Sequence, residues 1–198
     1  MQPRASCASG WKRVAGRHHG AQPDRGDNAV YRMLPLALAL RDAIAPEFAA
    51  RRHDVLGSAS LNLGVFQGGK DLNIVPDHCR VGLDIRWHPG LPADEVIARL
   101  QAACAEFAPR ATLRVHRTGP AFVTARTEPW AKRLRRAGRG WATADWFYDA
   151  NIFAAHGIPA VAFGPGDIAQ AHTRDEFIRE RDLAAGAAAF FEFLTATP

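Results

Sequence analysis

Histidine is the residue type of this 198-residue chain best suited to bind zinc or to move a proton near neutral pH, and eight histidines are present. His18 and His19 are adjacent in sequence, so their side chains point in different directions on regular structure. We therefore do not expect them to share a metal ion. Three more lie in polar or strand-edge contexts and are expected at the surface: His53, His88 and His116.

His172 has a different setting. It follows a short apolar segment at residues 160–163 and the turn Gly164-Pro165-Gly166, and two carboxylates come shortly after it. Loops at the carboxyl ends of strands are where α/β folds carry ligands and catalytic groups. His172 is therefore a candidate functional residue, although a plain surface loop would show the same spacing.

The spacing of residues along the sequence does not indicate a nucleophilic catalytic site or a nucleotide-binding loop. No Ser-His-Asp or Cys-His arrangement stands out, and Gly68-Gly69 lacks the spacing of a nucleotide-binding loop. The three cysteines are too few and too scattered for a disulfide scaffold: Cys7, Cys79 and Cys104.

Hydrophobic periodicity predicts the elements that must position these residues. Apolar residues recur at helical spacing over residues 27–44, where Pro35 is expected to kink the helix or to break its first half. Residues 79–87 alternate between apolar and polar or small residues, which predicts a strand that ends at Pro89. A helix is expected to begin near Pro92, with acidic residues in its first turn.

Up to residue 118 the predicted order is strand, helix, strand, strand, helix, strand, over residues 11–16, 27–44, 60–67, 79–87, 92–107 and 111–117. This is the order of a ferredoxin-like βαββαβ unit, an α+β arrangement with two helices on one face of an antiparallel sheet. Residues 1–9 are expected to be an irregular N-terminus, and residues 10–118 one domain.

Residues 119–198 have α/β character. We expect a helix at 129–137, a helical turn at 151–156, a short strand at 160–163 and a final helix with an apolar side that includes Phe190, Phe191 and Leu194. About 80 residues are too few for a comfortable layered domain of their own. Part of the apolar surface in this segment should therefore lack its cover.

Composition excludes several classes of protein. The chain is 47% apolar, which excludes a disordered chain, and its apolar run at 33–40 is far shorter than a membrane span of ~20 residues. The first ten residues lack the apolar stretch of a signal peptide. The expected compartment is therefore the cytoplasm, with no membrane partner.

The net charge of +5 could indicate nucleic-acid binding. However, 22 of the 25 basic residues are arginine, which suggests a compositional bias. The basic cluster at residues 132–139 lies on a predicted helix without a nucleic-acid motif. We therefore expect no nucleic-acid partner; salt-sensitive binding through Arg133, Arg135 and Arg136 would indicate one.

Four stretches, in order, resemble the zinc-dependent peptidase and amidohydrolase family that includes acetylornithine deacetylase, succinyl-diaminopimelate desuccinylase and glutamate carboxypeptidase. Together these stretches place the resemblance over roughly residues 10–195, and the fourth is the most specific. They are His19-Gly-Ala-Gln-Pro23-Asp-Arg-Gly26-Asp-Asn28-Ala29; Gly68-Gly69-Lys-Asp-Leu-Asn73-Ile-Val-Pro76-Asp77; Asp84-Ile-Arg86 with Pro89-Gly90; and Gly157-Ile-Pro159 through Gly164-Pro165-Gly166 to Ala171-His172-Thr173-Arg-Asp175-Glu176.

The resemblance implies roles for four residues. His172 matches a ligand of the second zinc in a two-metal site, for which cobalt or manganese are alternatives, and His19 matches a catalytic histidine that reaches the other subunit's site. Asn73 and Arg86 match substrate-binding positions, where a guanidinium suits a carboxylate. Each also has a purely structural interpretation: a loop residue, a turn residue or an ion-pair partner.

The resemblance further implies a homodimer and hydrolysis of an amide bond in an N-acyl amino acid or small peptide. However, the family's other metal ligands and its general base lie upstream of the first stretch, where only 18 residues remain here. We therefore expect a complete lid or dimerisation domain at 10–118 and the C-terminal part of a catalytic domain at 119–198, with weak activity or none. The alternative is a non-enzymatic dimerisation or binding module.

Overall fold

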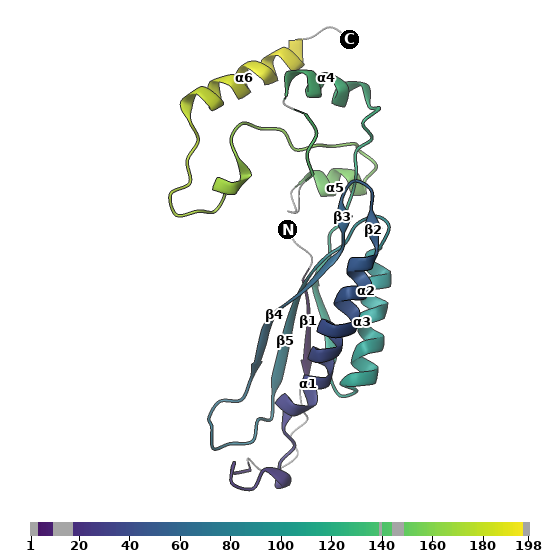
Figure 1. Ribbon diagram of the computed structural model, residues 1–198, viewed down its shortest axis with the longest axis vertical. Helices are drawn as coiled ribbons and strands as arrows, with labels where there is room; N and C mark the ends of the chain where they lie inside the picture. The colour runs from purple at the N-terminus through teal and green to yellow at the C-terminus, as the bar shows by residue number, and fades with distance from the viewer. Residues whose placement is uncertain (1–3, 10–17, 139, 144–148, 196–198) are drawn as a thin grey trace.

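The structure is a computed structural model that describes residues 4–9, 18–138, 140–143 and 149–195. The strand predicted at residues 11–16 lies outside these ranges. The described chain forms an elongated molecule with an N-terminal part, residues 4–117, and a C-terminal part, residues 119–195, at one end of it (Figure 1). None of the described helices has the length and apolar character needed to cross a bilayer.

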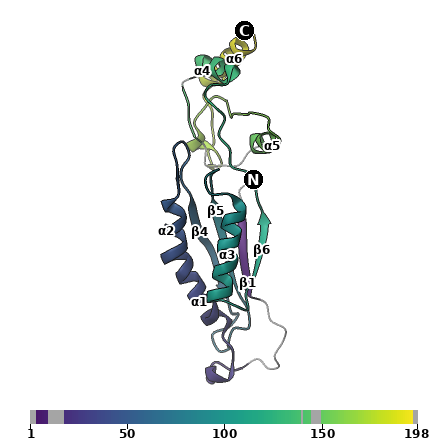
Figure 2. The same ribbon diagram turned by 90° about the vertical axis from the view of Figure 1, so that its right-hand side faces the viewer.

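The N-terminal part is built on one antiparallel sheet with the strand order β4-β5-β1-β6. Its strands are β1 (Arg4–Ser9), β4 (Ser60–Gly68), β5 (Cys79–Arg86) and β6 (Thr112–Arg117). The helices α1 (Ala29–Ala39), α2 (Ala45–Ala50) and α3 (Ala93–Phe107) lie on one face of this sheet (Figures 1 and 2). This arrangement confirms the predicted ferredoxin-like unit.

The first strand corrects the prediction for the N-terminus. Arg4–Ser9 was expected to be irregular, yet β1 pairs with β5 on one side and with β6 on the other. The segment reads Arg-Ala-Ser-Cys-Ala-Ser and contains no large apolar residue, so it shows no strand periodicity. Backbone hydrogen bonds to two neighbouring strands, which are distant in sequence, determine its conformation.

The core lies between the sheet and its helices. Alternation along β5 directs Val81, Leu83 and Ile85 toward the helices, where they are almost completely buried. Met33 of α1 and Leu100 of α3 pack against them in the same cluster. Cys79 belongs to this core, and burial raises the pKa of its thiol, so at neutral pH it packs as a protonated, apolar group.

The first helix continues through Pro35. Asn28 caps it by accepting hydrogen bonds from the backbone N–H groups of Val30 and Tyr31. The irregularity comes later, as a π-helical turn at Leu40–Ile44 that directly precedes α2 and Pro46. In this turn Ala45 N–H donates to the carbonyl of Leu40, five residues back, and the next residue, Pro46, has no N–H to donate.

Two short strands form a separate ribbon next to the end of the sheet. They are β2 (Arg52–His53) and β3 (Gly57–Ser58), and they follow α2 directly. At the other end of the sheet, a single turn of 3₁₀ helix, Pro23–Arg25, precedes α1.

The C-terminal part contains short helices and extended connections. Its helical segments are α4 (Pro129–Ala137), α5 (Ala150–Ala155), a 3₁₀ turn at Ile168–Gln170 and α6 (Glu180–Thr195). The strand predicted at residues 160–163 is wrong: the segment forms no ladder. A strand needs a partner, and here the carbonyl of Ala160 accepts a hydrogen bond from the Thr124 hydroxyl instead.

Burial differs sharply between the two parts. The buried core cluster contains only residues between 29 and 108. None of the described residues of α6 is buried, and Phe190, Phe191 and Leu194 are at least half exposed. The expectation that apolar surface in the C-terminal part would lack cover is therefore confirmed.

This contrast predicts different costs for the same substitution in the two parts. Leu100→Ala should lower the free energy of unfolding by about 2–5 kcal/mol, because it opens a cavity in the core. Leu194→Ala, at an exposed site on α6, should change it by less than about 0.5 kcal/mol. Urea unfolding followed by circular dichroism measures both, and equal costs would contradict the location of the core.

Candidate functional site

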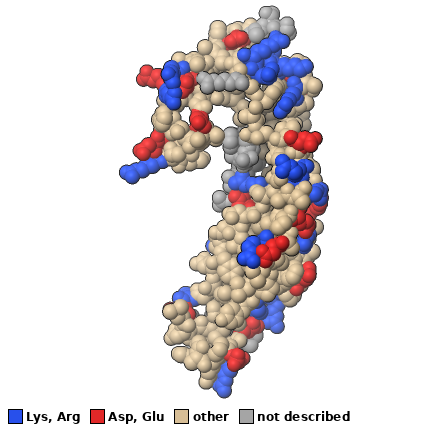
Figure 3. Space-filling view, viewed as in Figure 1, with Lys and Arg blue, Asp and Glu red and all other residues tan. Residues whose placement is uncertain are grey.

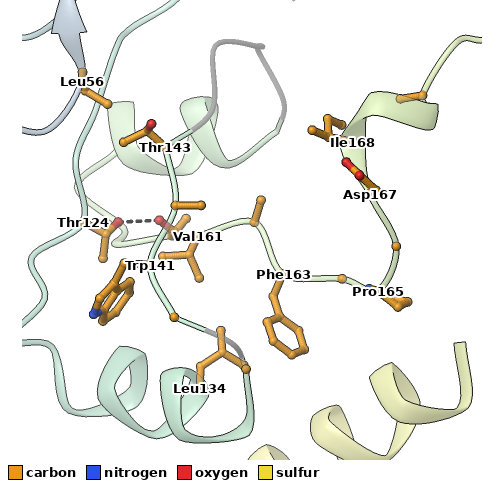
Figure 4. Close-up of a pocket in the computed structure, with 18 of the residues that line it drawn as sticks. Leu56, Thr124, Leu134, Trp141, Thr143, Val161, Phe163, Pro165, Asp167 and Ile168 are labelled. Atoms are coloured by element: carbon orange, nitrogen blue, oxygen red, sulfur yellow. Dashed lines mark hydrogen bonds between the residues drawn. The ribbon is translucent and has the colours of Figure 1, made fainter. Parts of the chain in front are cut away.

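A hollow of about 1800 Å³ lies between the end of the sheet and the C-terminal part. Figure 3 shows that the molecule is hollowed beneath the C-terminal part, and Figure 4 shows some of its lining, including Thr124, Leu134, Phe163 and Ile168. The sheet contributes polar side chains from β4 and β5, whereas much of the opposite wall is apolar. The hollow is lined by both apolar side chains and polar or charged ones of either sign, among them Arg86 at the end of the sheet. Such a mixed lining can bind a ligand that has both polar and apolar groups.

The alternation of β5 places Asp84 and Arg86 on the side of the sheet away from the helices, at the strand end beside the hollow. Nη2 of Arg86 donates a hydrogen bond to Oδ2 of Asp84 at 3.1 Å. Directly across on β4 lie Asn62, opposite Asp84, and Ser60, opposite Arg86. All four residues line the hollow, so Arg86 has a defined orientation in a polar strip.

His172 lies in the loop before α6, with a left-handed backbone at φ = 65°. Its backbone N–H donates to Oε2 of Glu176 at 2.9 Å, and its side chain is exposed. The neighbouring Ala171 and Glu176 line the hollow. The loop therefore holds His172 in an uncommon backbone conformation at the margin of the hollow.

The residues that the structure describes do not make up a zinc site. A catalytic zinc ion takes about three protein ligands. Within the described ranges no group of three His, Cys, Asp or Glu side chains is placed to hold an ion. His172 would need ligands from outside this set.

His19 and Asn73 lie together at the opposite end of the sheet. Residues 18–20 run beside the loop between β4 and β5: His19 and Ile74 form a β-bridge, and Gly20 N–H donates to the carbonyl of Asn73 at 2.6 Å. Nδ1 of His19 accepts from Ala21 N–H at 3.1 Å. Both His19 and Asn73 are exposed.

The structure thus divides the four predicted site residues into two groups. Arg86 lines the hollow, and His172 lies beside it, next to Ala171, which lines it. His19 and Asn73 lie at the far end of β4 and β5, near the loop that joins these two strands. Within one chain, no single site combines the two groups. Any shared site requires a second chain or a large rearrangement.

His88 was expected at the surface, and this prediction is wrong: its side chain is only 3% exposed. Its Nδ1 accepts from Gly90 N–H at 3.1 Å, and its Nε2 lies 2.9 Å from the carbonyl oxygen of Arg51. With Nδ1 accepting, Nε2 must carry the proton and donate to that carbonyl. His88 thereby ties the end of β5 to the end of α2. His88 lies two residues after Arg86, so the alternation of β5 predicts that it faces away from the core. The sequence pattern therefore did not reveal that His88 is buried.

Comparison with known proteins defines the class. Residues 6–112 match the model of the M20 peptidase dimerisation domain. The chain is 31% identical over 183 residues to acetylornithine deacetylase of Myxococcus xanthus, and 31% identical over 175 residues to a putative succinyl-diaminopimelate desuccinylase of Mycobacterium tuberculosis. These alignments cover 83% and 85% of this chain but only 46% and 47% of the relatives. The chain therefore spans about half of their length.

Solved structures share the fold. An M20 family metallo-carboxypeptidase from Sulfolobus solfataricus has a TM-score of 0.80 at 14% identity, over 98% of this chain and 58% of that one. Aminopeptidase PepT from Bacillus cereus has a TM-score of 0.65 at 22% identity, over 98% of this chain and 52% of that one. The match of residues 6–112 to the family model shows that the ferredoxin-like unit is a peptidase dimerisation domain. The chain belongs to the M20 peptidase family.

The hydrogen bonds of His88 give a test of its structural role. His88→Leu should lower the free energy of unfolding by about 1–3 kcal/mol, because the Arg51 carbonyl and the Gly90 N–H lose their partner. His156→Leu, at an exposed position after α5, is the matched control and should have little effect. Thermal unfolding of the two variants measures this, and similar stabilities for both would contradict the assignment.

Proposed function

We propose that this chain is the dimerisation domain and C-terminal catalytic part of an M20 hydrolase that cleaves an amide bond in an N-acyl amino acid or a small peptide. The observation that carries the proposal is the similarity to a deacetylase and a putative desuccinylase across both parts of the chain. The hollow beside Arg86 supports it, because it combines a guanidinium with an apolar wall.

In this proposal Arg86 binds the substrate's carboxylate. The guanidinium can form paired hydrogen bonds to a carboxylate, and its contact with Asp84 limits the orientations that it samples. The apolar wall near Phe163 and Ile168 would then receive an apolar portion of the substrate. In this proposal these residues bind and orient the substrate. No metal-dependent step is assigned to the described residues.

The family likeness also supports a homodimer, and the edges of the sheet differ in a way that favours one surface. Strand β4 has β5 on one side and, in the described chain, no strand on the other. Its nine residues carry no charge, whereas the opposite edge strand, β6, contains Arg114, His116 and Arg117. Charged edge strands resist pairing, and a long uncharged edge invites it. We propose that two copies pair through β4.

An exposed apolar surface adjoins this edge. Tyr31, Leu34 and Leu38 recur on one side of α1 and are 68%, 41% and 48% exposed. Val65 and Phe66 of β4 are also more than one third exposed. A second copy would bury this surface together with the strand edge.

Pairing through β4 would bring the two groups of site residues together. A two-fold axis perpendicular to the sheet makes identical edge strands antiparallel. Gly68, at one end of β4, then approaches Ser60 of the partner subunit, which lines the partner's hollow. His19 and Asn73, which lie beyond Gly68, would thus reach the hollow that contains Arg86 of the partner subunit.

A second candidate function is a dimerisation or binding module without catalysis. The lack of a three-ligand metal group in the described ranges favours it. In that case the chain would dimerise but would not support hydrolysis in any context.

A hybrid protein tests hydrolysis. The 198-residue chain with added zinc should hydrolyse N-acetyl amino acids weakly or not at all, because no three-ligand group is placed to hold a metal among its described residues. Joined to the portion of the Myxococcus xanthus deacetylase that it does not cover, it should hydrolyse them steadily. His172→Ala should then abolish this activity, and His156→Ala should preserve it. Steady hydrolysis by the chain alone, or a folded but inactive hybrid, would contradict the proposal.

The two edge strands offer matched variants for the dimer. Val65→Lys on β4 should raise the dimer dissociation constant at least about tenfold, because it places a charge in the pairing edge. Val115→Lys on β6, at a valine of similar exposure, should leave it unchanged. Sedimentation velocity over a range of concentrations gives both constants. If Val115→Lys raises the dissociation constant and Val65→Lys does not, the interface lies at β6, and the proposed pairing through β4 is wrong.

A further inference from the structure

Leu72 is fully exposed, at 107% of its reference area, and is the most exposed large apolar side chain of the described chain. It lies in the loop between β4 and β5, directly before Asn73. A leucine entirely in water forgoes the favourable burial that its side chain offers. Leu72 therefore offers the loop an apolar side chain that a second chain could bury.

The loop presents Leu72 on a fixed support. Gly69 starts the loop with φ = 77° and packs near Pro76. Two backbone hydrogen bonds then hold the loop to the segment before α1: Gly20 N–H to the Asn73 carbonyl at 2.6 Å, and Val75 N–H to the His18 carbonyl at 3.1 Å. Both bonds follow Leu72 in sequence, and a turn spans Leu72 itself, because Ile74 N–H donates to the carbonyl of Asp71 at 3.4 Å. The loop conformation around Leu72 is therefore fixed by backbone hydrogen bonds.

Antiparallel pairing of β4 determines what this loop meets. In the proposed dimer, the loop follows Gly68 and therefore extends past Ser60 of the partner subunit toward the partner's hollow. The apolar wall of a hollow includes Phe163, Ile168 and Phe177, which are 39%, 57% and 56% exposed. The pairing therefore brings the exposed Leu72 of one copy close to the exposed apolar wall of the other copy's hollow.

We propose that Leu72 of each copy seats against the apolar wall of the partner's hollow. This inference rests on the dimer of the proposed function. Leu72 then forms part of the hollow's lining from the second copy, beside Asn73. A ligand whose carboxylate is held by Arg86 would meet this leucine with its apolar portion, so Leu72 would favour ligands with an apolar group there.

Photo-crosslinking tests the contact without any need for activity. The photoreactive amino acid p-benzoylphenylalanine replaces Leu72, and the labelled chains are mixed with ¹⁵N-labelled wild-type chains before irradiation. Mass spectrometry should find crosslinks between chains that join position 72 to residues 160–182. The same amino acid in place of Gln101, which is exposed on α3, should give no such crosslink.

The dimer constant gives a second measurement. Leu72→Ala should raise the dimer dissociation constant at least about tenfold, because burial of a leucine side chain is lost in each copy. A wild-type chain that is monomeric in sedimentation velocity would overturn both this inference and the proposed dimer. A dimer in which position 72 crosslinks elsewhere, and in which Leu72→Ala has no effect, would overturn the seating of Leu72 alone.

Discussion

The apolar layer between the sheet and its helices determines where every other group of the chain lies. Because Val81, Leu83 and Ile85 must face Met33 and Leu100, the alternate residues of β5 face the other way. That requirement puts Asp84 and Arg86 beside the hollow, and a slip of one residue in register would bury the arginine. The helices of this layer cover only one face of the sheet. Strand β4 lies at the edge of the sheet, and none of its residues is charged.

Because β4 and β5 are long, they hold the candidate site residues of one chain in two groups at opposite ends of the sheet. Arg86 lies at the end of β5 beside the hollow, while His19 and Asn73 lie where β4 has already turned toward β5. Antiparallel pairing through β4 is the simplest operation that joins opposite ends of the same sheet. In the C-terminal part, helix α6 buries none of its described residues, and the chain spans about half the length of its relatives.

Sequence patterns predicted those helices and strands whose packing against the core gives a periodic pattern of apolar residues. The alternation of β5, the helix after Pro92 and the order of a ferredoxin-like unit are confirmed, as is membership of the family. Strand β1 escaped because small residues show no period, and residues 160–163 are no strand because no partner strand lies beside them. The sequence suggested four site residues, but their division between two ends depends on topology. His88 was misplaced because burial of a histidine depends on distant partners, here Arg51.

In the proposed dimer two copies pair antiparallel along β4, and nuclear Overhauser contacts between the two chains report this pairing. In a dimer that mixes differently labelled chains, filtered spectra report only contacts between the two copies. We predict contacts between the Ser60 end of β4 in one copy and the Gly68 end in the other, because the two-fold axis reverses the strand. A dimer whose only contacts between chains involve β6 or α3 would contradict pairing through β4.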